Sequence, residues 1–319
     1  MNGRWGLTIP LSGVPLPEHA ALLASLPELG YTDAWSSEVA GNDGFTPLTL
    51  ASVWAPSLRL GTAIAPVFTR GPALLAMTAA ALAEAAPGRF ALGIGASSDV
   101  IVGRWNGIAF DRPYAHTRDV VRFLRAALSG EKVTEQYETF SVEGFRLGLR
   151  PDPPPRILVA ALRERMLRLG AREADGVILN WVSPQDVKRI AAIVTEDNPA
   201  AEIVTRIMVC PSEDAEAVRG FVRGLVTGYL TVPVYREYQK WLGHADALAP
   251  MWAAWDAGDR KAAVAAVPDA VVDAVCVHGP PDACKARIAE FVANGVTTPV
   301  LAVVPVGVDL RDAIHSLAP

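Results

Sequence analysis

Eight short apolar segments, separated by stretches of helical character, constrain the fold of this chain more than any other feature. They are residues 5–10, 31–36, 58–67, 89–95, 156–160, 176–180, 203–210 and 299–305. Their hydrophobic residues follow one another instead of alternating with polar ones, as in parallel strands that are buried on both faces. Eight strand–helix units that close on themselves form a (β/α)8 barrel, and we predict this fold. A doubly wound open sheet is the alternative, but it would not need eight strands.

Helices are expected after the early strands, at residues 19–29, 46–54 and 73–85. Two later connections, 96–155 and 211–282, are too long for simple strand–helix units. We expect the first to contain a helix near residues 114–128 and a strand pair at 132–147, and the second to be mostly helical. Both leave the C-terminal ends of strands, which form the catalytic face of a barrel. The sequence therefore predicts one barrel domain over residues 1–319 with two insertions.

Composition narrows the functional class. The chain has 319 residues, with 29 Lys+Arg against 34 Asp+Glu, and a formal net charge of −5. This mild acidity argues against a dedicated nucleic-acid binder, and no run of 18 apolar residues predicts a membrane span. The N-terminus lacks the pattern of a signal peptide, and the three cysteines and five histidines have no metal-ligand spacing. We therefore expect a cytoplasmic protein that binds no metal, membrane or nucleic acid.

The segment GIGASS, residues 93–98, ends the fourth predicted strand. Its two glycines would let the backbone approach a ligand closely, and Ser97 and Ser98 offer hydrogen bonds beside Gly95. The third glycine of the dinucleotide fingerprint is missing. A tight strand exit with a polar turn and no ligand explains the same residues.

The segment AALRER, residues 160–165, follows the fifth predicted strand where a helix is expected to begin. Small residues leave the backbone N–H groups of a first helical turn open to an anion. Basic residues at this end oppose the helix dipole, and a bound phosphate or carboxylate would offset that cost. A solvated basic face with Arg–Glu pairs is the alternative.

Further candidates are one carboxylate and a set of aromatic residues. Glu38 follows the second predicted strand, where a carboxylate can serve as a general base; a simply solvated glutamate is the alternative. Tyr229 and Tyr235 of the second insertion, with Trp105 and Trp181, are candidates for an apolar substrate pocket. The alternative is that these aromatic residues only attach the insertion to the barrel.

Six segments together resemble the bacterial luciferase-like superfamily, in its deazaflavin-dependent branch. They are AWSSEVAGNDGFTPL, LRLGTAIAPVFTRGP, GRFALGIGASS, RPYAHTRDVVRFL, ILVAALRERMLRLGAREADGVILNW and VHGPPDACKARIAEFVANGVTTPVL. They are spread over nearly the whole chain. The resemblance implies a (β/α)8 barrel that binds coenzyme F420, an 8-hydroxy-5-deazaflavin, or FMN at its C-terminal mouth. Dimers are common among similar enzymes, so a homodimer is one expected state.

The resemblance also implies which residues contact the cofactor. Similar enzymes carry a non-proline cis peptide bond behind the ring, and the matching bond joins Ala63 to Ile64, just before Ala65. The remaining implied contacts are Gly95, Ser97 and Ser98 near the ring or ribityl chain, and Ala160, Ala161, Leu162, Arg163, Asn180 and Trp181 around the phosphate.

Two departures from the family pattern bear on the reaction. Sugar-phosphate dehydrogenases of this superfamily carry an Asp-His pair at the end of the second strand, where this chain has Ser37 and Glu38. Without that histidine, a role in alcohol oxidation is disfavoured; we interpret Ser37 as a cofactor contact and Glu38 as the candidate proton carrier. The pterin reductase branch typically has a tyrosine where Phe68 stands.

The leading hypothesis is an F420-dependent oxidoreductase that transfers a hydride between C5 of the deazaflavin and a small organic substrate, such as an imine or enone. The first alternative is an FMN-dependent monooxygenase that receives reduced flavin from a partner reductase. The second is a barrel that binds a flavin or another ligand without catalysis. A phosphate-binding aldolase or isomerase is disfavoured, because no lysine lies on a predicted barrel strand.

Overall fold

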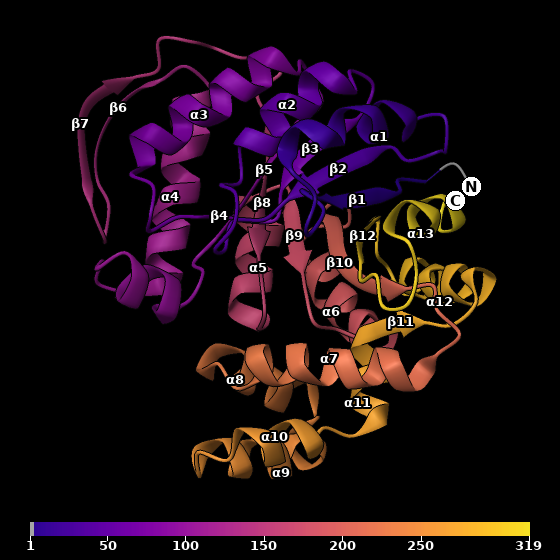
Figure 1. Ribbon diagram of the computed structural model, residues 1–319. Coiled ribbons are helices and arrows are strands. Elements are labelled where there is room, and N and C mark those ends of the chain that lie inside the picture. Colours follow the sequence, from indigo (N-terminus) through magenta and orange to yellow (C-terminus); the bar gives the residue numbers. More distant parts are fainter. Residues whose placement is uncertain (1–2) are drawn as a thin grey trace.

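The computed structural model describes residues 3–319 and shows a closed parallel barrel surrounded by helices (Figure 1). The ring order is β1, β2, β3, β5, β8, β9, β10 and β12, and β12 pairs with β1 to close it. The predicted (β/α)8 fold is therefore confirmed. The barrel strands are β1 Gly6–Ile9, β2 Asp33–Ser36, β3 Arg59–Thr62 with its short continuation β4 Ala65–Pro66, β5 Phe90–Gly95, β8 Arg156–Ala160, β9 Gly176–Leu179, β10 Glu202–Cys210 and β12 Thr298–Val303.

Each barrel strand leads, directly or after an insertion, to a helix on the outside of the ring. These helices are α1 His19–Ser25, α2 Thr46–Trp54, α3 Pro72–Ala85, α4 Pro113–Leu128, α5 Glu164–Glu173, α6 Pro184–Asp197, α12 Pro281–Ala293 and α13 Leu310–Ser316. Several begin with proline in their first turn, where the missing N–H has no helical partner to lose. The helix predicted at residues 46–54 is confirmed with the same bounds as α2.

Three details differ from the sequence-based expectations. The helix predicted for residues 19–29 ends at Ser25, because Pro27 cannot donate the N–H that would continue it. The strand predicted for residues 58–67 is divided into β3 and β4, with the Ala63–Ile64 bond between them. A short strand, β11 Cys276–His278, lies in the connection expected to be mostly helical and pairs with the end of β10.

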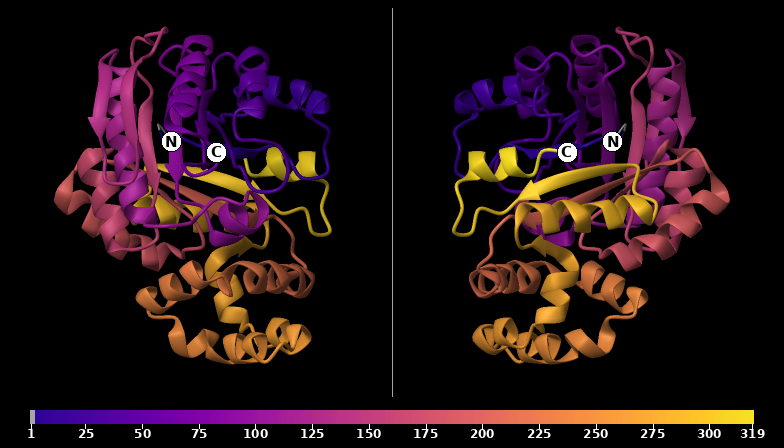
Figure 2. Two further views of the ribbon diagram at one scale, coloured as in Figure 1. Left: turned by 90° about the vertical axis from the view of Figure 1, so that its left-hand side faces the viewer. Right: turned by 90° about the vertical axis from the view of Figure 1, so that its right-hand side faces the viewer.

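The two long connections carry their own elements. The first contains the π-helical turn η2 Val100–Trp105, then α4, then the hairpin of β6 Lys132–Gln136 and β7 Ser141–Arg146. The second contains α7 Ala215–Leu230, α8 Pro233–Leu242, α9 Ala245–Asp256, α10 Arg260–Ala265 and α11 Asp269–Val275. Figure 2 shows these five helices projecting from one side of the barrel. Their apolar core is continuous with Met208 and Cys210 at the end of β10.

The barrel interior is a packed core. Its central residues are Trp35, Ala91, Leu158, Ile178, Val204 and Val300, each from a different strand. The Trp35 ring crosses the space beside β3, where a Cβ atom on Gly61 would lie 2.3 Å from ring carbons. Glycine is therefore required at position 61 for the tryptophan to fill the centre.

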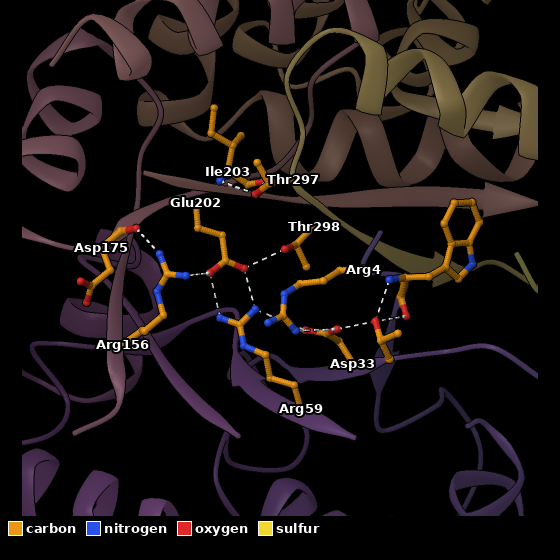
Figure 3. Close-up of polar contacts among 11 residues, drawn as sticks. Arg4, Asp33, Arg59, Arg156, Asp175, Glu202, Ile203, Thr297 and Thr298 are labelled. Atoms are coloured by element: carbon orange, nitrogen blue, oxygen red, sulfur yellow. Dashed lines mark hydrogen bonds and ion pairs between the residues drawn. The ribbon is translucent and has the colours of Figure 1, made fainter. Parts of the chain in front are cut away.

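Charged residues close the N-terminal end of the barrel (Figure 3). Arg59 binds both carboxylate oxygens of Glu202, at 2.6 and 2.8 Å, and also approaches Asp33 at 3.4 Å. Thr298 donates a further hydrogen bond to Glu202 at 2.7 Å, and Arg4 pairs with Asp33 at 3.3 Å. This paired network lies opposite the C-terminal ends of the strands, where barrel enzymes bind their ligands.

Candidate functional site

The residues predicted to contact the cofactor, together with Glu38, lie at or just after the C-terminal ends of β2, β3, β5, β8 and β9. These five strands are consecutive in the ring, so their loops form one continuous arc of the C-terminal mouth. The arc contains Ser37 and Glu38, Ala63 to Ala65, Gly95 to Ser98, Ala160 to Arg163, and Asn180 with Trp181. The fold thus brings together segments that are more than 140 residues apart in the chain.

Three of these loops meet at Gly95. A Cβ atom on Gly95 would lie 2.9 Å from the Cβ of Ala160 and 3.2 Å from Cγ1 of Ile64. Both distances are shorter than a normal carbon–carbon contact, so a side chain here would push the loops apart. The Ala63–Ile64 peptide bond is cis, as the resemblance implies. We call Ala63, Ile64, Gly95 and Ala160 the Gly95 junction.

Hydrogen bonds between Thr62 and Gly93 hold β3 and β5 together just before the Gly95 junction. The Thr62 hydroxyl donates to the carbonyl of Gly93 at 2.7 Å and accepts from its N–H at 2.9 Å. A Cβ atom on Gly93 would lie 1.9 Å from the Thr62 carbonyl oxygen. Glycine therefore allows β3 and β5 to approach closely at the point where their regular pairing ends.

Glu38 lies on the wall of an open pocket of about 220 Å³, which Asp43, Thr69 and Asn106 also line. Its Oε2 atom accepts hydrogen bonds from Arg70 at 2.9 Å and from the backbone N–H of Gly44 at 2.8 Å. Among residues 3–319 we find no hydrogen bond to the other oxygen, Oε1. One carboxylate oxygen is thus held in place while the second is available to a molecule in the pocket.

The turn after β5 carries the two predicted serines, both partly exposed. Ser97 has φ +65°, a left-handed conformation that is uncommon for residues other than glycine. The Ser98 hydroxyl accepts the N–H of Ile101 at 3.4 Å. This turn directs the chain away from the Gly95 junction and into η2.

The first turn of α5 is open, in contrast to that of α6. Arg163 is the N-cap residue of α5, is exposed, and provides no side-chain cap. Ser183 and Asp186 instead satisfy the start of α6 through a reciprocal capping box. Of these two helix starts, α5 therefore has N–H groups available to an anion at the mouth.

Further along α5, the arginines form a basic face paired with carboxylates, which was the alternative to an anion site. Arg168 pairs with Glu164, Glu196 and Asp197 at 3.0 to 3.1 Å, and Arg172 pairs with Asp197 at 2.9 Å. Carboxylates already neutralise the charges of these two arginines, so we do not assign them a role in ligand binding.

Three of the four predicted pocket aromatics form one cluster. The Trp181 and Tyr229 ring centroids are 4.8 Å apart, and Tyr235 meets Tyr229 edge-on at 6.0 Å. Trp181 is buried and has φ +58°, and Asn180 beside it interacts through its side chain with the Tyr235 hydroxyl. Burial raises the pKa of Tyr235 to about 12, so its hydroxyl remains a donor at neutral pH. Trp105 lies apart from this cluster on η2 and is 56% exposed.

Sequence reasoning did not identify two arginines at the mouth. Arg70 follows β4 and contacts Glu38, Asp43 and the Phe45 ring. Arg206 lies within β10, and a charged residue inside the otherwise apolar segment IVTRIMVC is a signal that could have singled it out.

His116 is a packing residue next to the site. Its ring centroid lies 4.3 Å from that of Phe68, and its nitrogens meet the Thr139 hydroxyl at 3.0 Å and the Val67 carbonyl at 3.3 Å. Burial lowers the pKa of His116, so it is neutral at physiological pH. It fixes the loop after β4 to the β6–β7 hairpin.

Metal ligands and membrane-spanning helices are both absent from the part of the chain that the structure describes. Within residues 3–319 there is no group of three or more histidine, cysteine or acidic side chains placed to hold a metal ion. The same residues contain no helix with the length and apolar character required to span a membrane.

Comparison with known proteins then identifies the family. The sequence profile of the luciferase-like monooxygenases matches residues 5–298. The chain belongs to the luciferase-like monooxygenase family. This luciferase-like protein is 29% identical to the 5,10-methylenetetrahydromethanopterin reductase of Methanolobus tindarius, over 96% of this chain and 95% of that one.

Two solved structures are similar in fold to this luciferase-like protein. The coenzyme F420-dependent tetrahydromethanopterin reductase of Methanopyrus kandleri superposes with a TM-score of 0.82 at 20% identity, covering 100% of this chain and 98% of that one. The oxygenating constituent of 3,6-diketocamphane monooxygenase from Pseudomonas putida, in complex with FMN, gives a TM-score of 0.67 at 18% identity and covers 100% and 97%.

Proposed function

We propose that this protein is an F420-dependent oxidoreductase that passes a hydride between the deazaflavin and an electrophilic carbon of a small organic substrate. The observation that carries the proposal is the Gly95 junction, where a residue without a side chain lets three strand-end segments pack closely at the barrel mouth. A flat ring system would lie against such a closely packed surface. The 24% identity to a putative coenzyme F420-dependent oxidoreductase of Mycobacterium tuberculosis, over 94% of this chain, supports the deazaflavin over FMN.

The loop after β9 suits a polar part of the cofactor. Two buried polar atoms of this loop have no hydrogen-bond partner within the described chain, Asn180 Oδ1 and Trp181 Nε1. Buried polar groups are normally paired, so these atoms indicate a ligand that supplies both donors and acceptors. The ribityl hydroxyls and the phosphate of a deazaflavin or flavin would do so.

The phosphate of the cofactor would be held at the start of α5. The backbone N–H groups near Leu162 and Arg163 are available there, and Ala160 and Ala161 add no bulky side chain. A negative charge at this end is stabilised by the helix dipole. The loops that hold the phosphate and those that support the ring are neighbours in the ring order, as one elongated cofactor requires.

When bound, the deazaflavin supplies the hydride at its C5 position. The protein provides orientation, exclusion of water and control of protons. Ser37 and the Gly95 junction would orient the ring, and Glu38 Oε1 would carry a proton to or from the substrate. Arg70 and the Gly44 N–H fix the other oxygen, so the carboxylate is positioned before the substrate arrives.

The test of this proposal is titration of the purified, cofactor-free protein with F420 and, separately, with FMN, followed by fluorescence. We expect micromolar or tighter binding of F420 and at least tenfold weaker binding of FMN. Reduced F420 should then be consumed in the presence of imines or enones. Failure to bind F420 would overturn the assignment.

The FMN-dependent monooxygenase is the second candidate, and one observation favours it. The barrel superposes on an FMN-containing oxygenating enzyme over its whole length. Preferential binding of FMN, with oxygenation only when a reductase supplies reduced flavin, would support this candidate. Binding of either cofactor without turnover of any acceptor would support a barrel that binds without catalysis.

A further inference from the structure

Arg206 points into the barrel from β10. Side chains alternate between the two faces of a strand, and two residues on β10 fix which face is internal. Glu202 meets Arg59 inside the N-terminal end, and Val204 belongs to the central cluster with Trp35 and Val300. Arg206 comes two residues after Val204, so it occupies the next internal layer, closer to the mouth.

The guanidinium of Arg206 has no counter-charge in the described structure. Its Nε atom is buried without a hydrogen-bond partner, and no carboxylate of residues 3–319 lies within 4 Å of it. The residue as a whole is only partly buried. Burial lowers the pKa of Arg206, but an arginine stays charged even so. An unpaired buried cation is costly, and a bound anion would remove this cost.

The aromatic cluster forms the surroundings of Arg206. Tyr229 and Tyr235 are close enough to act on its charge. The Tyr229 ring packs against Trp181, and the Tyr235 ring meets Tyr229 edge-on. The Tyr235 hydroxyl is a donor, and the amide oxygen of Asn180 is buried without a partner. The cluster therefore combines one cation, hydroxyl donors and a flat apolar wall.

The ring order places this cluster across the mouth from the surface proposed for the cofactor. β10 is four positions from β3 in either direction around the barrel. β3 leads into Ala63 and Ile64 of the Gly95 junction. A molecule that contacts Arg206 therefore lies on the side of the mouth facing the proposed cofactor, where a hydride acceptor belongs.

We propose that Arg206 binds a carboxylate of the substrate, so that the substrate class is a small organic acid with an apolar or aromatic body. The planar guanidinium matches the two oxygens of a carboxylate, and the Trp181–Tyr229 wall accommodates the body. Tyr235 donates to the same group. The substrate role rests on the proposed oxidoreductase function, whereas the anion site itself does not.

The test uses the cofactor-free full-length chain and two probes of the same shape, benzoate and benzamide, at constant ionic strength. Quenching of tryptophan fluorescence reports binding, because Trp181 forms part of the site. We expect the wild-type protein to bind benzoate at least tenfold more tightly than benzamide. R206Q should bind both probes alike, and R206K should keep part of the preference. R311Q, which alters an exposed arginine on α13, should behave as wild type.

Thermal unfolding separates ligand binding from a structural role. Because Arg206 has no partner to lose, R206Q is expected to melt at the wild-type temperature or above it. A preference for benzoate that persists in R206Q, or that is absent from the wild type, would overturn the proposal. Tighter binding of inorganic phosphate than of benzoate would overturn the carboxylate assignment.

Parallel titration with F420 distinguishes the two proposals. Wild-type protein that prefers benzoate but does not bind F420 would overturn the oxidoreductase function and leave the anion site. Protein that binds F420 but shows no preference for benzoate would overturn the anion site and leave the oxidoreductase function. We expect R206Q to bind F420 within twofold of the wild type, because Arg206 lies across the mouth from the Gly95 junction.

Discussion

Arg59 and Glu202 lie on strands at opposite sides of the barrel, and their side chains meet inside it through two parallel hydrogen bonds of 2.6 and 2.8 Å. Burial alone would raise the pKa of Glu202, but the hydrogen bonds and charge of Arg59 outweigh this and hold its pKa below the ordinary value. The pair links β3 to β10 at the closed end. Because Arg206 is on the same face of β10, one strand carries a neutralised charge at the closed end and a free one at the mouth.

Replacing Glu202 by glutamine tests how much this pair contributes to stability. E202Q leaves Arg59, with only 9% of its side chain exposed, without its main counter-charge. Loss of one partner of a buried pair typically costs about 3–5 kcal/mol. We expect a loss of that size in the free energy of unfolding, measured by urea denaturation.

The exposed pair of Arg122 and Glu173 provides the matched control. These side chains are 51% and 30% exposed, and exposed ion pairs contribute about 0–1 kcal/mol. R122Q should therefore change the unfolding midpoint little. Equal losses in E202Q and R122Q would show that the internal pair has no special role.

Gly95→Ala is the sharpest test of the cofactor surface. The added methyl group would lie 2.9 Å from the Cβ of Ala160, which has no rotamer that could relieve the contact. The junction must then open, so we expect at least a tenfold loss of F420 affinity in the fluorescence titration. Gly148→Ala, where no atom lies within 4 Å of the new Cβ, should bind F420 normally. Normal F420 binding by G95A would contradict our placement of the cofactor.

The barrel was predictable because its signal is repeated. Eight apolar runs with intervening helical patterns allow few folds, and an error in one boundary leaves the others intact. The helix predicted to end at residue 29 illustrates such an error, because Pro27 stops it at Ser25. The segments of the site could also be located, since each one follows a predicted strand.

What the sequence could not provide is which side chains of the mouth are already paired. Glu38 and Arg206 are both charged residues near strand ends, and nothing local shows that Arg70 binds the first while the second has no partner. Pairing depends on contacts between distant segments. The prediction for Trp105 fails for the same reason. A tryptophan is a suitable pocket residue, but the position of η2 leaves this side chain exposed and apart from the other aromatic residues.

Glu38→Gln tests the proposed proton carrier. Glutamine can keep the contacts that fix the loop but cannot exchange a proton. A general acid or base usually contributes about 10²–10⁴-fold, so we expect kcat to fall at least a hundredfold once a substrate is found. F420 affinity should change little, since the cofactor surface lies at the Gly95 junction.

Controls for Glu38 separate chemistry from loop structure. R70M removes the partner that holds Oε2 at 2.9 Å but leaves the carboxylate, so it should raise KM more than it lowers kcat. E143Q, on the exposed β6–β7 hairpin, should match the wild type. Unchanged kcat in E38Q, with a lowered melting temperature, would assign Glu38 a purely structural role.

His244 and Asp186 link the second insertion to α6, and their contact makes stability depend on pH. The hydrogen bond from His244 to Asp186, 3.1 Å long, raises the pKa of the histidine. Burial would raise the pKa of Asp186, but His244 and Ser183 together lower it. A histidine whose pKa is higher when folded stabilises the protein fully below its unfolded pKa of about 6.5. This stabilisation is lost as the pH rises through the folded-state pKa, and at acid pH it declines as Asp186 is protonated.

H244Q should therefore be less stable than wild type near pH 5.5, and the difference should shrink by pH 8 in urea denaturation. The exposed His315→Gln variant should show no such trend; a difference for H244Q that grows with pH would contradict the assigned pair.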